Sequence, residues 1–347
     1  IPNFTTHSFR LRPREYFYPA STTKFPIAVL ALEKANQNSK INPYLRLEVL
    51  TEKRKLNGVV RDLSSESGYP TLAHYIRKLF VVSDNAANNR LYEFLGRDHI
   101  NNRLWDLGYE NTRIRHRLSI VLDEELNRYT NPFVFYDNDQ IVYEQPSQIA
   151  RLELDHSFDD HLIGSYHYSN GKKKDGPIDF STKNFMNLYE QHEFMKQVIF
   201  PESVELKERV YLSDEDYNLL YQEMSILPRQ SKYPEYPDYD TYYDGYCKIF
   251  MYGDTKDRIP DHIKIFNKVG LAYGFLLDNA YIIDIKNNVE FILTAVVYHN
   301  DNETMNDDKY EYDDITIPFL AELGRKIYDN ELARDKKHLP DFERFIN

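Results

Sequence analysis

An almost unbroken apolar run, residues 27–35, follows a short polar turn, and this junction constrains the fold more than any other stretch of the chain. The run is rich in strong helix formers, so we expect a buried helix from Ser21 to about residue 38. Ser21 stands where serine is favoured as a helix N-cap. Lys24 follows three residues later on the same helical face, so a hydroxyl and an amine are predicted to lie side by side at the positive end of the helix dipole.

This pair can be interpreted as a nucleophile and its base. An amine that is buried beside other cations loses its proton and can deprotonate the serine. Free N–H groups at the start of the helix would then stabilise the oxyanion of a tetrahedral intermediate. Alternatively, Ser21 only caps the helix and Lys24 is exposed, which is the commoner case for an isolated S-x-x-K pattern.

Composition excludes several classes of function. The chain has 347 residues, enough for a large core, and a net charge of −12, which argues against a nucleic-acid partner because phosphate binding needs a basic surface. No apolar run is long enough to cross a membrane.

The single cysteine, Cys247, excludes cysteine-based metal sites, and no phosphate-binding glycine motif occurs. His156, His161 and His167 fit no single helical face. We therefore expect neither a metal nor a cofactor.

Two further polar motifs stand at structural boundaries. Ser83-Asp84-Asn85 separates two predicted helices, residues 71–82 and 86–95. On its own, this triplet would be interpreted as a helix stop and cap.

Lys268-Val269-Gly270 lies on the first strand of a predicted antiparallel meander, whose other strands are residues 279–285 and 289–298. Glycine within a strand allows a ligand to approach the backbone closely. A helix is expected to follow, from residue 315 to about 335.

Three motifs follow one another along the chain: S-x-x-K at a helix start, S-D-N between helices and K-x-G on a strand. In this order they resemble the signature of class A β-lactamases and penicillin-binding proteins. The resemblance covers roughly residues 1–130 and 260–330. It implies an α/β (α+β) fold, in which an antiparallel sheet is flanked by helices beside a helical subdomain. It also implies one catalytic domain over 1–347, with a family-specific insertion at about 135–260, and a periplasmic or cell-surface location.

The resemblance implies a role for each motif residue. Ser21 would attack a carbonyl carbon and form an acyl-enzyme, and Lys24 would act as the base for that attack. Ser83 would relay a proton to the leaving nitrogen. Asn85 would anchor Lys24 and a substrate amide.

The strand motif would bind the substrate. Lys268 would supply positive charge for a substrate carboxylate, and the N–H groups of Ser21 and of Leu271, which follows Gly270, would form the oxyanion hole. The family usually carries Thr or Ser between the lysine and the glycine, whereas Val269 has no hydroxyl to donate.

The base for deacylation is assigned in two ways. Class A enzymes use a glutamate shortly before Leu-Asn, and matching back from Leu126-Asn127 places Asp123 at that position. Matching forward from residues 111–114 places Leu118 there instead. Asp123 is thus the candidate base, with Glu124, Glu125 or no base at all as the alternatives.

The expected function is that of a serine hydrolase, with β-lactamase-like hydrolysis of a β-lactam or related amide as the leading prediction. The substrate would be a small or peptide-like molecule with a carboxylate. The alternatives are a penicillin-binding D,D-peptidase or esterase-like hydrolase with slow deacylation, and a non-catalytic ligand-sensing module that retains the pocket. A tyrosine-rich segment, residues 233–246, is either an aromatic lid for a bulky substrate or a loop packed on the domain.

Overall fold

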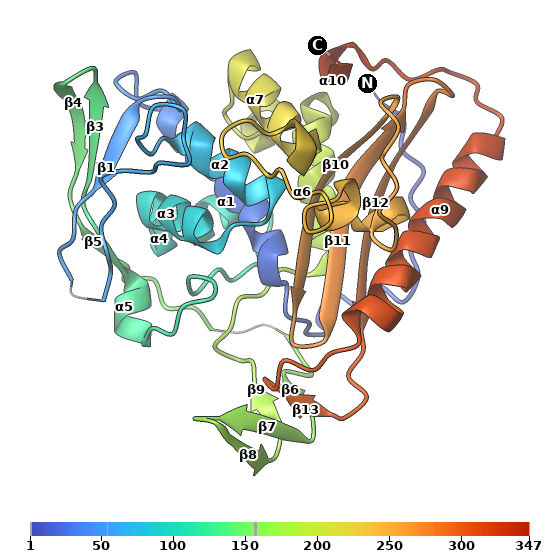
Figure 1. Ribbon diagram of the computed structural model, residues 1–347, viewed down its shortest axis with the longest axis horizontal. Coiled ribbons are helices and arrows are strands. Elements are labelled where there is room, and N and C mark those ends of the chain that lie inside the picture. The colour runs from blue at the N-terminus through green and yellow to red at the C-terminus, as the bar shows by residue number, and fades with distance from the viewer. Residues whose placement is uncertain (1, 54, 156–157, 347) are drawn as a thin grey trace.

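A computed structural model describes residues 2–53, 55–155 and 158–346, and it has the predicted α/β architecture (Figure 1). Strands β10 (Ile263–Ala272), β11 (Phe275–Asp284) and β12 (Val289–Tyr298) form an antiparallel sheet in that order. This is the meander expected from the sequence, and its first turn is made by two residues. Helices lie on both faces of the sheet.

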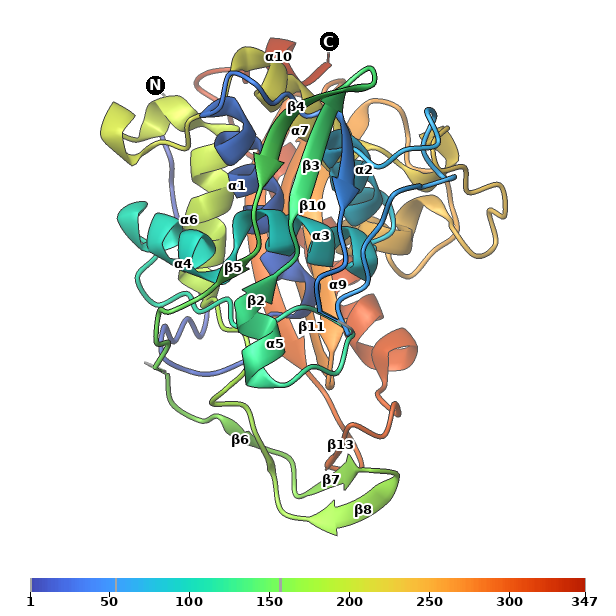
Figure 2. The same ribbon diagram turned by 90° about the vertical axis from the view of Figure 1, so that its left-hand side faces the viewer.

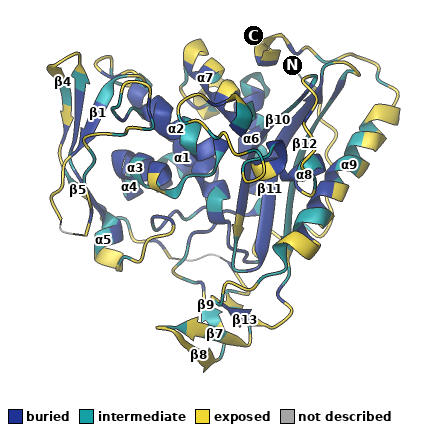
Figure 3. Ribbon diagram, viewed as in Figure 1, coloured by how far each residue is buried: buried dark blue, intermediate teal, exposed yellow. Residues whose placement is uncertain are grey.

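Each face of the sheet carries its own apolar cluster, because side chains alternate along a strand. On one face, Phe266, Tyr281 and Ile283 pack in a cluster with residues of α6 (Leu188–Ile199). On the other face, Ile265 and Ile282 belong to a cluster that includes Leu320 of α9 (Ile317–Ala333). Every position of β11 is consequently buried, as the dark central strand in Figure 3 shows.

The helical half of the molecule is built around α1 (Lys24–Asn36), which is buried along almost its whole length. Around it pack α2 (Leu72–Val81), α3 (Asn85–Leu95) and α4 (Arg97–Asp106) (Figure 2). Helices α2 and α3 lie where the sequence predicts them. A helix that is apolar on all sides needs such an enclosure, which explains why the sequence of α1 shows so little amphipathic pattern.

The start of this helix differs from the prediction. Residues Ala20–Thr23 form a 3₁₀ turn, η1, and the α-helix begins only at Lys24. Ser21 is therefore not the helix N-cap. Thr22 and Thr23 hydroxyls instead donate to the carbonyls of the preceding turn, at 2.7 and 3.0 Å.

The segment 135–260 contributes to the main core as well as to the periphery. Its helices α6 and α7 (Asp214–Ser225) pack into the same cluster as α1. By contrast, β7 (Tyr166–Ser169) and β8 (Lys172–Asp175) form a hairpin that projects from the body with β13 (Thr304–Met305) at its edge (Figures 1 and 2).

Short elements complete the chain. They are β1 (Arg46–Val49), β3 (Phe133–Asp137) and β4 (Gln140–Gln145) in one sheet, the pairs β2 (Tyr129–Thr130) with β5 (Gln148–Ile149) and β6 (Leu162–Ile163) with β9 (Ile178–Asp179), and the helices α5 (Glu124–Arg128), α8 (Ile249–Tyr252) and α10 (Glu343–Ile346). Among the described helices, none has the length and apolar character needed to span a bilayer.

Gly270 brings the sheet and the helical half into contact. A Cβ atom at this position would lie 2.7 Å from Pro19 O and 2.9 Å from the backbone nitrogens of Ser21 and Thr22. Strand β10 therefore passes directly against the turn that carries Ser21, and only glycine permits this approach.

We expect Gly270→Ala to lower the free energy of unfolding by about 1–3 kcal/mol, because the added methyl group meets backbone atoms that cannot rotate away. Thermal and urea unfolding measure the loss. Gly171→Ala is the control, since its methyl group meets nothing within 4 Å and adds only the strain of a left-handed residue, about 1–2 kcal/mol. A Gly270→Ala protein as stable as wild type would contradict the close approach.

Candidate active site

Ser21 is half-buried at the junction of the two halves of the molecule, in the turn η1. Among the described residues, no hydrogen bond holds its hydroxyl. Because Thr22 and Thr23 satisfy the carbonyls of the turn, the Ser21 hydroxyl remains available for chemistry.

The Lys24 amine is fully buried in a set of polar groups supplied by the connection between α2 and α3. Its Nζ atom lies 2.7 Å from Asn85 Oδ1 and 3.2 Å from Ser83 Oγ, and it also contacts the main-chain oxygen of Ser83. Burial, together with the charge of nearby Lys268, holds the pKa of Lys24 well below its usual value. A lowered pKa makes this amine a candidate base.

Ser83 adopts a left-handed backbone conformation, with φ of +58°. Non-glycine residues in this region are strained and persist only where their surroundings hold them. Here Lys24 contacts the Ser83 carbonyl, and Asp84 fixes the start of α3 by accepting a hydrogen bond from Ala87 N at 2.7 Å. The Ser83 hydroxyl is thereby directed between two lysine amines.

The second of these amines belongs to Lys268 on β10. Its Nζ atom donates to Ser83 Oγ at 2.8 Å and to the carbonyl oxygen of Val269 at 2.9 Å. Burial lowers the pKa of Lys268 to about 8. Hydrogen bonds thus join Lys24, Ser83, Asn85 and Lys268 in one network, although Lys268 and Ser83 are 185 residues apart in the chain.

The edge of β10 presents backbone groups to Ser21. Ala272 and Phe275 flank the two-residue turn and form a hydrogen-bonded pair, so Leu271 at the next position turns its N–H away from β11. This outward edge is the one that meets the Ser21 turn at Gly270. The N–H groups of Ser21 and Leu271 are therefore the candidate donors for an oxyanion hole at this junction.

Residues 3–151 match a family model described as the beta-lactamase enzyme family. Over these residues the chain is similar to that family.

Solved structures show the same fold over nearly the whole chain. An ancestral class A beta-lactamase (GNCA) is 14% identical, with a TM-score of 0.51 and coverage of 92% of this chain and 88% of the other. The beta-lactamase from Sphaerobacter thermophilus DSM 20745 is 12% identical, with a TM-score of 0.50 and coverage of 92% and 85%. No curated protein matches the sequence. At such identities the likeness establishes the fold and leaves activity open.

The acidic candidates for the beta-lactamase deacylation base have other partners. Asp123 is exposed and caps α5 by accepting from Leu126 N at 2.8 Å. Glu124 pairs with Arg97 and Arg128 at 2.7 and 3.0 Å. In the described part of the chain, no hydrogen bond or ion pair joins either acid, or the exposed Glu125, to the lysine–serine network. The role of Asp123 as base stays a prediction.

The residue that does reach the network from this loop is Ser119, which sequence reasoning missed. Its Oγ accepts a hydrogen bond from Asn85 Nδ2 at 2.8 Å. Its neighbour Leu118 is fixed to α3 by paired hydrogen bonds with Asn89, each of 2.9 Å. Matching forward from residues 111–114 points to Leu118 in this part of the loop, but nothing in the pattern marks a serine as the contact.

Val269 is buried in the apolar cluster on the α9 side of the sheet, with Ile249 and Phe250. The position where beta-lactamase relatives usually carry a hydroxyl is therefore occupied by a packed aliphatic side chain.

The tyrosine-rich segment, residues 233–246, borders the site. Tyr236, Tyr242 and Tyr246 form a chain of rings with centroids 4.9 and 5.3 Å apart. Burial and the Asp84 carboxylate raise the pKa of Tyr236, so this buried ring lies within electrostatic range of the Ser83–Asp84 connection. The segment is thus packed on the domain and also adjacent to the site, so both sequence interpretations remain open.

Possible metal ligands do not gather around Ser21 in the described residues. His156 lies outside them, His161 pairs with Asp179 at 3.8 Å, and His167 contacts Gly176 O at 2.9 Å. His299, Asp301 and Glu311 bring ligand atoms within 4.8 Å of one another, but His299 Nε2 and Asp301 Oδ1 already contact each other at 2.8 Å.

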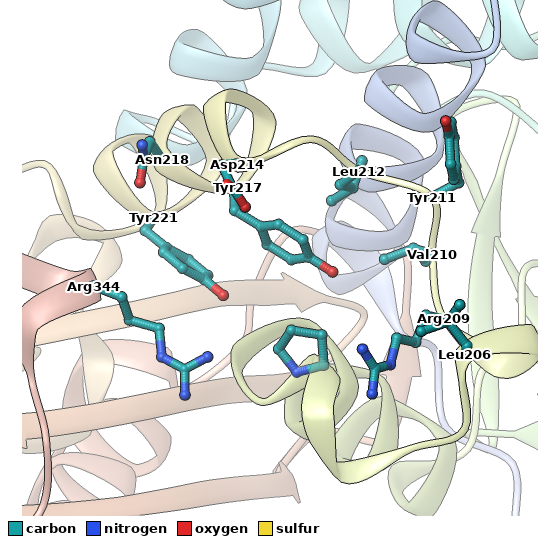
Figure 4. Close-up of a pocket in the computed structure, with 11 residues that line it drawn as sticks. Leu206, Arg209, Val210, Tyr211, Leu212, Asp214, Tyr217, Asn218, Tyr221 and Arg344 are labelled. Atoms are coloured by element: carbon teal, nitrogen blue, oxygen red, sulfur yellow. The ribbon is translucent and has the colours of Figure 1, made fainter.

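A separate cavity of about 540 Å³ lies at the other end of α1. Figure 4 shows Tyr217 and Tyr221 of α7 directing their rings toward Arg209 and Arg344 across it. Because Tyr211 in its lining is bonded to Glu33, near the C-terminal end of α1, this cavity is about 18 Å from the Ser21 turn along the helix.

The buried lysines give the protein a pH-dependent stability. Burial lowers the pKa of both Lys248 and Lys268 to about 8, against about 10.4 in an unfolded chain. Between pH 8 and pH 10 the unfolded state consequently binds more protons than the folded state, so the free energy of unfolding rises with pH. Buried tyrosines with raised pKa values oppose this rise above pH 10.

We therefore expect the free energy of unfolding, measured with urea, to increase from pH 8 to pH 10. Lys268→Met should reduce the slope of this increase with pH. Lys172→Met, which changes an exposed lysine on β8, is the matched control and should leave the slope unaltered. An identical slope in wild type and Lys268→Met would contradict the lowered pKa.

Proposed function

We propose that this chain is a serine hydrolase that reacts through an acyl-serine at Ser21. The observation that carries the proposal is the buried Lys24 amine, hydrogen-bonded to Asn85 and Ser83. The similarity of residues 3–151 to the beta-lactamase enzyme family supports the same chemistry.

The proposed acylation uses the groups of the network in turn. Lys24 Nζ takes the proton of Ser21 Oγ, and the oxygen attacks the carbonyl carbon of an amide. The resulting oxyanion is stabilised by the N–H groups of Ser21 and Leu271. As the carbon–nitrogen bond breaks, the proton held by Lys24 passes through Ser83 Oγ to the leaving nitrogen. Water then hydrolyses the acyl-serine, which releases the acid and restores the Ser21 hydroxyl.

The proposed substrate is a small or peptide-like molecule that carries a carboxylate. The protonated Lys268 amine, at the end of the network, would bind that carboxylate. The leading candidate is a β-lactam or a related amide, and the family resemblance suggests a periplasmic or cell-surface setting. Because Val269 cannot donate a hydrogen bond, a carboxylate would bind more weakly here than where this position holds Thr or Ser, by roughly 0.5–3 kcal/mol.

Slow deacylation is the second candidate behaviour, as in a penicillin-binding D,D-peptidase or an esterase-like enzyme. It is favoured by the position of Asp123, whose carboxylate caps α5 at 2.8 Å from Leu126 N. A site that acylates readily but lacks a positioned base for water would retain its acyl group.

The decisive experiment is intact-protein mass spectrometry after mixing with a fluorescent penicillin or a chromogenic cephalosporin. We expect a mass increase equal to one β-lactam, and no increase in Ser21→Ala. An adduct that clears with product release establishes a β-lactamase, whereas a persistent adduct establishes the slow-deacylation alternative. If wild type forms no adduct, β-lactam chemistry is wrong, and an esterase or a ligand-sensing module is left.

Replacing the base tests the role of Lys24. Lys24→Met should slow adduct formation by about 10²–10⁴-fold, which is the usual contribution of a general base. Lys34→Met is the matched control because Lys34 lies on the same helix and burial lowers its pKa to about 8, yet its Nζ contacts Phe94 O away from the site. Equal rates in the two folded variants would contradict the assignment of Lys24.

A further inference from the structure

A second polar cluster lies directly behind the site, on the opposite face of β10 from the Lys268 side chain. Its centre is Asn267. The Nδ2 atom of Asn267 donates to Asp278 Oδ1 and to Cys247 O, each at 2.7 Å, and its Oδ1 atom accepts from Lys248 Nζ at 2.8 Å. These side chains are almost completely inaccessible to solvent.

Chemistry fixes the orientation of the Asn267 amide. A lysine amine held this way donates to the amide oxygen, and a carboxylate accepts from the amide nitrogen, so the Lys248 and Asp278 contacts permit only one orientation. Asp278 Oδ2 also accepts from Phe250 N at 3.2 Å, and Lys248 Nζ also donates to Met224 O at 2.6 Å. The cluster therefore ties β10 to β11, to the end of α7 and to the start of α8.

The cluster also decides which charges surround the Lys268 amine. Several titratable groups influence the charge of Lys268: Lys24 of α1, Cys247 and Lys248 before α8, and Asp278 of β11 on the opposite face of the sheet, whereas Asp84 acts on Lys24. Of these groups, Asp278 is the carboxylate that acts on Lys268, and it is wholly buried.

We propose that Asp278 is a positioning residue of this site, which fixes β10 through Asn267 and keeps the Lys268 amine protonated for binding a substrate carboxylate. The substrate part rests on the function proposed above, whereas the relation between the two charges does not depend on it. Without a nearby negative charge, an amine buried this deeply beside two others gives up its proton.

The titration order agrees with this assignment. Burial raises the pKa of Asp278 to about 6, and burial lowers that of Lys268 to about 8, with Cys247 and Asp278 opposing the decrease. Between pH 6 and pH 8 the carboxylate is ionised and the amine is protonated, so the pair is charged in this window.

The test measures the pKa of Lys268 in the Asp278→Asn variant by NMR of protein labelled at lysine Cε. The Lys268 signal is assigned with the Lys268→Arg variant. We expect the Lys268 titration to move to lower pH by about one unit, and the alkaline limb of the Ser21 acylation rate to move with it. The sign follows because removing a negative charge disfavours the protonated amine.

Asp244→Asn is the matched control. Asp244 is also buried in this region, but its carboxylate is paired with Arg229 at 2.9 Å and does not face Lys268. We expect this variant to lose stability and leave the Lys268 titration where it is in wild type. If Asp278→Asn also loses stability without moving the titration, its role is only structural and the proposal is wrong.

A charge-swapped double variant, Asn267→Asp with Asp278→Asn, keeps the test decisive if the single variant folds poorly. It restores one carboxylate to the same cluster, so the Lys268 titration should return close to that of wild type. Failure of the swap to restore it in a folded protein would overturn the charge assignment. Should wild type form no β-lactam adduct, the function proposed above fails, whereas the NMR titration still decides the role of Asp278.

Discussion

Burying lysine amines where the sheet meets the helical half is the constraint on which the rest of this structure depends. Three of them, Lys24, Lys248 and Lys268, lie within the described core, and each is almost inaccessible to solvent. A buried amine is tolerated only if it is neutral or surrounded by acceptors and counter-charge. The Ser83 carbonyl, the Asn85 and Asn267 amides and the Asp278 carboxylate meet this requirement, and they also define the chemistry of the site.

This constraint explains features that would otherwise look unrelated. The strained backbone of Ser83 places its carbonyl against Lys24 and its hydroxyl against Lys268. The glycine at position 270 lets β10 approach the Ser21 turn. This approach brings the Lys268 amine to the Ser83 hydroxyl, on the side opposite Lys24. Each irregularity has a cost in local energy, and each is retained because it completes the environment of an amine.

Much of the fold could be predicted from the sequence, because local patterns determine it. The helices around α1 and the strand of residues 289–298 follow from apolar periodicity and from turn residues. The motif residues could also be named, since their order is distinctive. The contacts of the site were harder to foresee. Ser119 and the cluster of Asn267, Lys248 and Asp278 depend on side chains that meet only after folding, and no spacing announces them. The 3₁₀ turn was missed for a related reason: two threonine hydroxyls, rather than that of Ser21, satisfy its carbonyls.

The long separation between Lys268 and Ser83 has a consequence for biosynthesis. Ser21, Lys24 and the Ser83–Asn85 connection are all translated within the first quarter of the chain, but the hydrogen bond from Lys268 that completes their network spans 185 residues. Domains of this size fold as units once their long-range contacts can form. On the ribosome, the early part of the chain therefore carries Ser21 without Lys268, and the lysine–serine network is complete only when β10 has emerged and docked.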